Sequence, residues 1–323
     1  MVNTPNIWVL ADDRAGNVGQ CLGVAEALNW PFERKDIAYN KLAKLPNFLL
    51  GARLCGVQAL SRDGLQAPWP DLVIAAGRRT APVARYIKKQ SKGRAKLVQI
   101  MHPGSAGAED FDLIFVPDHD AKTVAANEVL MIGAPHRVTD GKLAEAREIW
   151  TPRFKELGRP LIALIVGGAT KDKEFSTEMA KALGQQVNQL AASLGAGVLL
   201  TTSRRTGTAA QAIVDEITVP AFIYQWGDAG ENPYFGFLAC ADYIVVTGDS
   251  VSMCSESCAA GKPVSIFAPA NMISDKHQRM VTSMVEKGGA GLFNGQELAT
   301  TPASLNVTQD IAGKIKTLFT VEQ

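Results

Sequence analysis

Short apolar runs alternate with amphipathic stretches from one end of this chain to the other. The runs have the length of strands and are bounded by Gly, Pro, Asp or Asn, and the stretches between them have helical spacing. Such alternation is typical of parallel sheets covered by helices, so the sequence predicts an α/β fold. The predicted strands are Ile7–Ala11, Asp71–Ala76, Lys96–Met101, Leu113–Val116, Val129–Ile132, Leu161–Val166, Gly197–Thr201, Ala221–Tyr224, Tyr243–Val246 and Val264–Phe267.

A charged, helix-prone segment at 142–157 separates two series of strands. Since a domain usually has about 100 to 200 residues, a chain of 323 residues has room for two. We therefore predict an N-terminal domain over residues 1–157 and a C-terminal domain over 158–304. A last helix, within 305–323, is expected to return to the first domain. The helices predicted in the first half lie near Val18–Leu28, Ala43–Leu60 and Thr80–Lys89.

Composition narrows the classes of function. A net charge of +1 gives no overall attraction for nucleic acid, so no nucleic-acid partner is expected. The 5 cysteines lack CxxC or zinc-ligand spacing, which favours a reducing compartment over a disulfide framework. No signal sequence and no apolar run near the roughly 18 residues of a membrane span is present. We expect a cytoplasmic protein without a transmembrane segment, and leave open peripheral attachment to a membrane.

The segment Val246–Phe267 carries the clearest candidate site. A predicted strand ends in Gly248-Asp249, and a helix follows whose first turns place hydroxyls where unpaired N–H groups and the helix dipole favour a phosphate. A carboxylate further along the helix is suited to accept hydrogen bonds from a ribose. The alternative is a capped crossover in which the serines bond only to backbone and the glutamate is solvated. The candidate residues are Ser250, Ser252, Ser255 and Glu256.

Polar, glycine-rich segments also follow other predicted strands, at the edge where open parallel sheets bind ligands. After the first strand, Gly16 and Gly19 allow the backbone to approach a ligand. In the second half, two further loops carry glycines and cations, and adjacent arginines are suited to bidentate phosphate binding. A solvated loop is the alternative for these arginines. The candidate residues of the second half are Gly167, Gly168, Lys171, Ser203, Arg204, Arg205 and Thr206.

Two common cofactor patterns are missing. The loop after the first strand is not GxGxxG and has no suitably placed acidic residue about 20 positions later, so a dinucleotide cofactor is not predicted. Asp110-Phe111-Asp112 has the DxD pattern of metal-dependent transferases, but it precedes a predicted strand instead of following one. We interpret it as a turn, and we predict neither a metal nor a cofactor.

The motifs of the chain resemble known proteins. The Ser-rich turn with Glu256 and the arginine loop are similar to the nucleotide-sugar site in the donor domain of the glycosyltransferase-B superfamily. More narrowly, the chain resembles the family of the plant mitochondrial fission factor named for elongated mitochondria, whose plant member is a peripheral membrane adaptor for a dynamin-related GTPase. That resemblance implies two Rossmann-like domains facing across a cleft. The motifs that carry it are DDRAGNVGQ from Asp12, VPDHD from Val116, GAPHRVTDGKL from Gly133, VGGATKD from Val166, TTSRRT from Thr201 and TGDSVSMCSES from Thr247.

Transfer of a sugar needs a base near the acceptor hydroxyl. Asp12, Asp13 or His119 is suited to this role, since each follows a predicted strand of the first domain. The alternative for each is a structural loop cap, which is the commoner role of carboxylates and histidines at strand ends. The remaining candidate residues of the first domain are predicted to lie on the side that binds the acceptor. That set comprises Gly16, Asn17, Gln20, Asp120, His136 and Arg137.

Two hypotheses of different classes follow. The first is a metal-independent, inverting glycosyltransferase that binds a nucleotide sugar in the C-terminal domain and transfers it to an envelope glycan or lipid. The second is a non-catalytic adaptor that keeps the fold and binds a protein partner through its surface. An epimerase or dehydrogenase is a distant third, because the Ser/Tyr/Lys triad and the dinucleotide loop are absent from the sequence.

Overall fold

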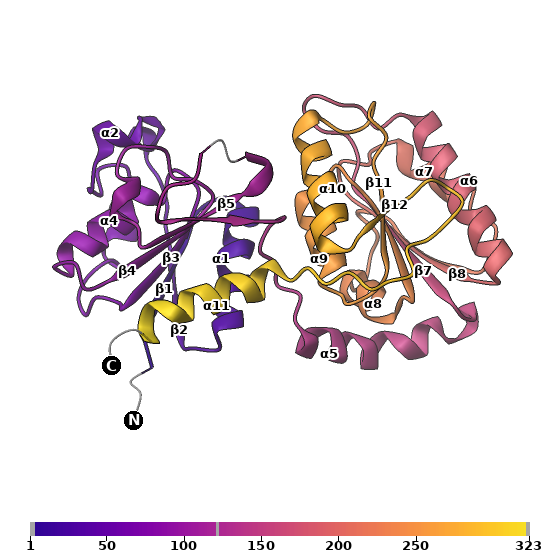
Figure 1. Ribbon diagram of the computed structural model, residues 1–323, viewed down its shortest axis with the longest axis horizontal. Helices are drawn as coiled ribbons and strands as arrows, with labels where there is room; N and C mark the ends of the chain where they lie inside the picture. The colour runs from indigo at the N-terminus through magenta and orange to yellow at the C-terminus, as the bar shows by residue number, and fades with distance from the viewer. Residues whose placement is uncertain (1–3, 121–122, 321–323) are drawn as a thin grey trace. The chain divides into compact units, whose positions relative to one another are not determined.

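The computed structural model describes residues 4–120 and 123–320. The chain forms two compact units (Figure 1). Unit 1 combines Met1–Arg137 with the C-terminal stretch Val307–Gln323, and unit 2 is Val138–Asn306. Each unit has its own parallel sheet, so the α/β class is confirmed, and each is described below by itself.

The sheet of unit 1 has the strand order β2-β1-β3-β4-β5-β6, and all neighbours pair in parallel. The direction of winding reverses between β1 and β3, which makes this the topological switch point where open sheets usually hold ligands. The strands are β1 Ile7–Ala11, β2 Phe32–Asp36, β3 Leu72–Ala76, β4 Lys96–Ile100, β5 Leu113–Pro117 and β6 Glu128–Met131.

Helices cover both faces of this sheet. On one face α1 and α11 pack with β1 and β3 around buried Val24, Ile311 and Ile315. On the other face α4 packs through Val83 and Ile87. The elements are α1 Ala15–Leu28, α2 Asn47–Leu50, α3 Ala59–Arg62, α4 Ala81–Gln90 and α11 Val307–Thr320, with short 3-10 helices η1 Lys41–Lys44, η2 Ala108–Asp110 and η3 Asp118–Asp120.

The C-terminal helix α11 lies beside α1, although nearly the whole chain separates them in sequence (Figure 1). Phe319 packs its ring edge against Trp30 with centroids 5.5 Å apart. At the other end of α11, Thr308 accepts a hydrogen bond from the His136 backbone N–H at 2.8 Å and donates to the His136 carbonyl at 3.0 Å. Apolar burial along the helix and this paired bond at its start hold α11 in unit 1.

The boundary between the units lies at Arg137 and Val138, ahead of the junction expected after residue 157. The intervening helices, α5 Asp140–Trp150 and η4 Thr151–Leu157, pack on unit 2 instead. The Trp150 ring stacks on Phe154 and meets Phe222 edge-on, and Gly236 leaves the space that Trp150 occupies. Aromatic packing therefore assigns to unit 2 a charged segment that the sequence prediction had placed at the end of the N-terminal domain.

The single helix expected near Ala43–Leu60 does not form. The structure has η1, α2 and α3 there, joined by turns. Pro46 lacks the N–H needed to continue a helix, and Gly51 takes a positive φ of 55° that ends α2. Strand β2 is also absent from the prediction, because its sequence FERKD is polar and it lies at an exposed sheet edge.

The sheet of unit 2 has the order β12-β11-β10-β7-β8-β9, with every pairing parallel. Its switch point lies between β7 and β10. The strands are β7 Leu161–Val166, β8 Gly197–Thr202, β9 Ala221–Tyr224, β10 Tyr243–Thr247, β11 Val264–Phe267 and β12 Gly291–Leu292; the helices are α6 Thr177–Leu194, α7 Ala209–Val214, α8 Tyr234–Cys240, α9 Val251–Cys258 and α10 Asp275–Gly288. Among the helices in the part of the chain that is described, none is long and apolar enough to cross a membrane.

Candidate functional site

Two glycines after β7 allow three loops to meet at the switch point of unit 2. A Cβ on Gly167 would lie 2.3 Å from a carboxylate oxygen of Asp249, in the loop after β10. A Cβ on Gly168, whose φ is 146°, would lie 2.2 Å from the Arg205 carbonyl in the loop after β8. Both positions therefore need glycine for the contact between loops, whether or not a ligand is bound.

Hydroxyl groups tie the β8 loop to the same place. Ser203 donates a hydrogen bond to the Gly167 carbonyl at 2.6 Å, and its hydroxyl accepts one from the Arg205 N–H at 3.1 Å. Thr206 also donates to the Gly167 carbonyl and accepts from the Ser203 N–H at 2.9 Å. These two predicted site residues hold the loop in shape, so their hydroxyls are already engaged within the protein.

The adjacent arginines differ in environment. The Arg205 guanidinium forms an ion pair with Asp249 at 2.7 Å and a hydrogen bond with the Ala169 carbonyl at 3.2 Å. The Asp249 side chain is fully buried, and the same oxygen accepts the Gly168 N–H at 3.0 Å. Arg204 and Lys171 are exposed. The structure thus provides one arginine fixed at the switch point and two cations whose side chains extend into solvent.

Helix α9 begins at this site. Ser250 is its N-cap and accepts the Met253 N–H at 3.4 Å, and Ser255 donates back to the Val251 carbonyl at 2.8 Å. Ser252 is exposed. The alternative that the serines bond only to backbone therefore describes Ser250 and Ser255. The start of α9 still directs its dipole and first-turn N–H groups toward the end of the sheet.

Glu256 is not solvated as the alternative interpretation required. It is half-buried, and its carboxylate accepts a hydrogen bond of 2.6 Å from the Tyr234 hydroxyl at the start of α8. Burial raises the pKa of Glu256 above its ordinary value, and the Tyr234 hydrogen bond opposes that shift. Burial, followed by the nearby Glu256, raises the pKa of Tyr234. The pair fixes one carboxylate oxygen one turn into α9.

An exposed tryptophan lies at the same edge of the sheet. Trp226 follows β9, and 62% of its surface is exposed. Its backbone N–H donates to the Thr202 hydroxyl at the end of β8, at 2.9 Å. The Asp228 carboxylate accepts the neighbouring Gln225 N–H at 2.7 Å and stabilises the turn. These bonds hold the backbone that carries the exposed indole next to the end of β8, where the arginine loop begins.

The corresponding edge of unit 1 is acidic and held by an arginine. Arg79, after β3, forms a two-pronged ion pair with Asp13 and lies 3.6 Å from Asp12. Asp12 is buried and accepts hydrogen bonds from the Arg14 N–H at 2.9 Å and the Asn17 amide at 3.0 Å. Hydrogen bonding from Arg79 is the main cause that lowers the pKa of Asp13. Two predicted base candidates therefore share one guanidinium.

The first turns of α1 next to this loop are partly open. The structure places Gly16 in the helix instead of the predicted loop, and nothing lies within 4 Å of a Cβ placed on it. The Gln20 side-chain oxygen is buried and has no hydrogen-bond partner. The Tyr39 hydroxyl is likewise buried without a partner, and the Arg79 guanidinium lies over its ring at 4.7 Å from the centroid. These oxygens mark unit 1's switch point as a polar site with unused acceptors.

His119 and Asp120 lie at a different strand end. They form η3 after β5, and His119 is buried. Its ring nitrogens are 3.7 Å from an Asp118 oxygen and 4.0 Å from an Asp120 oxygen. Because β3 and β4 lie between β1 and β5, the ends of β1 and β5 are about 14 Å apart at ordinary strand spacing. Asp12 and His119 are therefore alternatives for a base and do not form one cluster.

His136 and Arg137 have structural contacts. The His136 backbone bonds to Thr308, and a Cβ on Gly23 would lie 2.1 Å from the His136 carbonyl. Arg137 forms an ion pair with Glu26 of α1 at 2.5 Å. Both residues thus join the segment after β6 to α1 and α11. Their predicted place on the acceptor side stays a prediction.

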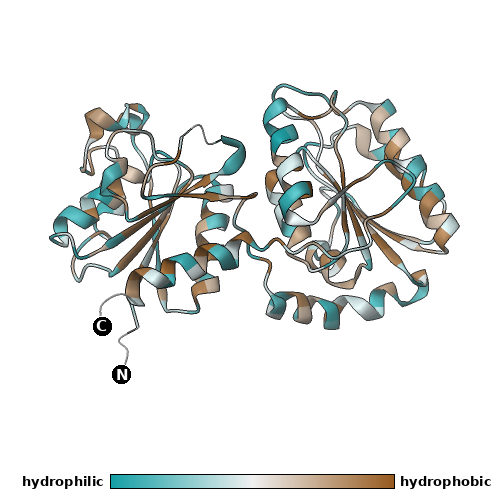
Figure 2. Cartoon of the chain, in the orientation of Figure 1, coloured by the Kyte–Doolittle hydropathy of each residue, from teal (hydrophilic) through white to brown (hydrophobic). Residues whose placement is uncertain are grey.

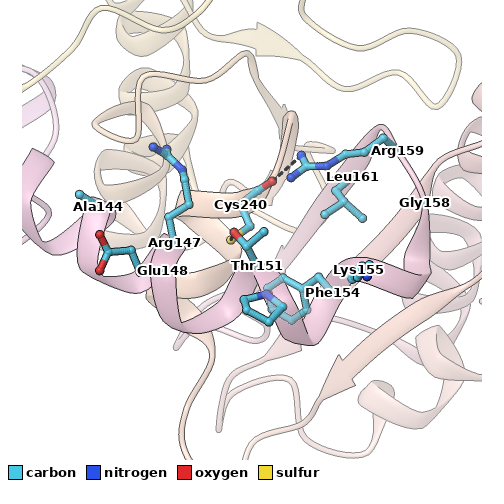
Figure 3. Close-up of a pocket in the computed structure, with 11 residues that line it drawn as sticks. Ala144, Arg147, Glu148, Thr151, Phe154, Lys155, Gly158, Arg159, Leu161 and Cys240 are labelled. Atoms are coloured by element: carbon cyan, nitrogen blue, oxygen red, sulfur yellow. Dashed lines mark hydrogen bonds between the residues drawn. The ribbon is translucent and has the colours of Figure 1, made fainter.

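A pocket of unit 2 lies at the other end of its sheet. It has a volume of about 810 Å³, and Leu161, the first residue of β7, lines it. Figure 3 shows Arg159 directed to the Cys240 carbonyl, which accepts its hydrogen bond at 2.9 Å. Since β7 has 6 residues and each advances about 3.3 Å, this pocket is about 20 Å from Gly167. It is not part of the switch-point site.

Sequence reasoning missed Asp249, Arg79 and Tyr234 as partners of the predicted residues. The sequence did contain one signal for the two arginine partners, a repeated tetrapeptide. GRRT at 77–80 directly follows β3, and SRRT at 203–206 directly follows β8. In both tetrapeptides the second arginine pairs with an aspartate at the end of another strand. In both, the threonine hydroxyl donates to carbonyls at a strand end.

Comparison with known proteins gives a family and a fold. A family model described as Mitochondrial fission ELM1 matches residues 15–319. An uncharacterized protein, RP120, of Rickettsia prowazekii is 34% identical over 326 residues, covering 90% of each chain. Mitochondrial fission protein ELM1 of Arabidopsis thaliana is 30% identical over 294 residues, covering 83% of this chain and 68% of that protein.

Solved structures agree on the architecture. UDP-GlcNAc 2-epimerase from Methanocaldococcus jannaschii superimposes with a TM-score of 0.51 at 12% identity, covering 97% of this chain and 99% of that one. A putative UDP-N-acetylglucosamine 2-epimerase from Listeria monocytogenes gives 0.52 at 13% identity, covering 98% and 97%. Two Rossmann-like domains of the glycosyltransferase-B type are thereby confirmed as the fold class.

Proposed function

This chain belongs to the mitochondrial fission ELM1 family, and we propose that it is a metal-independent glycosyltransferase whose unit 2 binds a nucleotide sugar. One observation carries the proposal: the switch point of unit 2 brings together a fixed arginine, a helix N-terminus and a half-buried carboxylate. These are the groups that a diphosphate and a ribose require.

Each group has a role in this proposal. Arg205 and the first-turn N–H groups of α9 hold the diphosphate, and Asp249 keeps Arg205 in place. Glu256 accepts hydrogen bonds from the ribose while Tyr234 orients its carboxylate. The exposed ring of Trp226 offers a stacking surface for the base. Lys171 and Arg204 have the freedom to close on the phosphates after binding.

The proposed chemistry is a single displacement. An acceptor hydroxyl attacks the anomeric carbon, the new C–O bond forms as the bond to the diphosphate oxygen breaks, and the leaving diphosphate takes the electron pair. The acceptor proton passes to a base of unit 1, for which Asp12, Asp13 and His119 are the candidates. Cationic groups at the diphosphate stabilise the charge that develops there. An envelope glycan or lipid is the proposed acceptor.

A thermal-shift screen tests donor binding. UDP-N-acetylglucosamine is the first probe, because the two structural relatives are named for it, followed by UDP, ADP and GDP. A ligand at 100 times its dissociation constant adds about 2.7 kcal/mol of stability. We expect a shift for one nucleotide series, lost in Glu256→Ala and kept in Ser193→Ala, a surface control on α6. No shift with any nucleotide contradicts the proposal.

The second candidate function is a non-catalytic adaptor for a protein partner. The family favours it, and so does the acidic site of unit 1: Arg79 engages both Asp12 and Asp13, and a lowered pKa makes Asp13 a weaker base. Turnover separates the two functions. If nucleotide binds but Asp12→Ala, Asp13→Ala and His119→Ala all release diphosphate at the wild-type rate, the assignment of the base is wrong; if no donor binds, the adaptor is favoured.

A further inference from the structure

The connection between β2 and β3 of unit 1 exposes large apolar side chains. Leu42, Leu45, Phe48 and Leu49 have 48%, 39%, 70% and 54% of their surface exposed. In the single turn of α2 the first and last residues are buried, so Phe48 and Leu49 point the other way, into solvent. Figure 2 shows the brown, hydrophobic colour of α2.

A polar network holds this connection in place. The Arg78 guanidinium donates hydrogen bonds to the Leu45 carbonyl at 2.7 Å and the Ala43 carbonyl at 3.1 Å. The buried Asn47 amide donates to the Arg78 carbonyl at 3.0 Å and the Pro103 carbonyl at 2.9 Å. The apolar side chains are therefore presented by an anchored scaffold. These side chains are exposed although the segment that carries them is hydrogen-bonded to the rest of unit 1.

The same connection is basic. No acidic residue occurs between Asp36 and Asp63, while the stretch contains Lys41, Lys44, Arg53 and Arg62. Lys41 and Lys44 are exposed and alternate with Leu42 and Leu45. In a chain whose net charge is only +1, this is a local concentration of positive charge beside exposed apolar groups.

We propose that the 41–49 surface, defined as Lys41, Leu42, Lys44, Leu45, Phe48 and Leu49, binds the headgroup region of a bilayer containing acidic phospholipid. The apolar side chains would insert at the boundary of the acyl chains, and the lysines would contact the phosphates. The inference goes beyond the proposed function and holds for an enzyme or an adaptor alike.

The pattern fits a lipid surface better than a protein partner. Protein interfaces deplete lysine, particularly at their centre. Here lysines alternate directly with the apolar residues, which is the arrangement of segments that lie in a membrane interface. The residues also come from one stretch of nine positions, formed by η1 and the first three residues of α2. The exposed apolar side chains are therefore already presented by folded helices and can enter the lipid without unfolding them.

Co-sedimentation with vesicles tests the inference on the full chain. One set of vesicles is phosphatidylcholine, and the other is an equal mixture of phosphatidylcholine and phosphatidylglycerol. We expect binding to the mixed vesicles that weakens as salt is raised, and little binding to neutral ones. Since each basic residue near an acidic surface contributes about fivefold to binding, Lys41→Gln/Lys44→Gln should lower the partition coefficient about 25-fold.

Matched variants identify the apolar contribution. Phe48→Ser/Leu49→Ser should lower vesicle binding at least about tenfold, because each loses an inserted side chain. Leu42→Ser/Leu45→Ser serves as a second variant if the first one melts below the wild type. Leu130→Ser, whose parent side chain is 46% exposed elsewhere in unit 1, and Lys314→Gln/Lys316→Gln on α11 should bind as the wild type does.

The outcomes are distinct. The inference is supported if the variants of the 41–49 surface lose binding to acidic vesicles and the control variants keep it. Wild-type protein that does not bind acidic vesicles, or apolar variants that bind them as well as the wild type does, overturns the inference. Failure of nucleotide binding has no bearing on either result, so this test and the test of the proposed function can fail separately.

Discussion

The Arg205 guanidinium lies 2.7 Å from the carboxylate of Asp249, whose side chain is fully buried. The second Asp249 oxygen has no hydrogen-bond partner, and the first also accepts the Gly168 N–H. A buried charge of this kind is stable only while its partners remain, so Asp249 depends on the loops after β7 and β8. The three loops of the candidate site are coupled through this one side chain.

Asp249→Ala should therefore destabilise unit 2. Removing the carboxylate leaves the Gly168 N–H without its acceptor and Arg205 without its ion pair. Since about a third of Arg205 is exposed and water can take over part of the contact, we expect a loss of about 1 to 3 kcal/mol in the free energy of unfolding. Urea unfolding measures it. Arg204→Ala is the control and should stay within about 0.5 kcal/mol of the wild type.

Gly168→Ala should be strongly destabilising, because the new Cβ would meet the Arg205 carbonyl at 2.2 Å and the backbone φ is 146°. Gly16→Ala provides the matched control within α1, where nothing lies within 4 Å and alanine is favoured by about 0.5 to 1 kcal/mol. The two substitutions should shift the melting temperature in opposite directions. Equal tolerance of both would show that the three loops do not pack as described.

Glu256 should give a characteristic pH dependence of stability. Burial raises its pKa in the folded chain above the ordinary 4.5, so the folded state binds more protons than the unfolded state in the window between the two values. The contribution of this group is fully present below pH 4.5 and is lost as pH rises through the folded pKa. Glu256→Gln cannot ionise, so its stability relative to the wild type should increase with pH across that window. Urea melts at several pH values test this, and a constant difference would contradict it.

The Asp13 carboxyl should titrate below its ordinary pKa of 3.8, because Arg79 donates hydrogen bonds to it. A carboxyl with a lowered pKa stabilises the folded state above its unfolded pKa and loses that contribution as pH falls through the folded value. In Arg79→Ala the titration midpoint, followed by NMR of the carboxyl carbon, should move up toward 3.8. Arg14→Ala removes a lesser influence and should produce a smaller shift. An unchanged midpoint in Arg79→Ala would mean that the ion pair does not form in solution.

The α/β class of the fold, and the sheet edges where candidate site residues gather, could be predicted from the sequence. Apolar runs of strand length report burial on both faces of a parallel sheet, and this property is local enough to read from one stretch at a time. For that reason Ile7–Ala11 and Leu161–Val166 were predicted with their observed bounds. The exposed edge strand β2 has no such apolar signal and was missed.

The partners of the polar residues could not be predicted from the sequence, because they depend on how distant segments pack. Asp249 and Arg205 are far apart in sequence, and so are Asp13 and Arg79; each pair meets because two nonconsecutive strands lie near one another in a sheet. Strand order also separates Asp12 from His119, which the sequence had grouped as equivalent bases. The assignment of α5 to unit 2 likewise depended on where the Trp150 ring packs. A residue's type and spacing specify what chemistry it can perform, whereas its neighbours across the fold decide whether its charge is free, paired or buried.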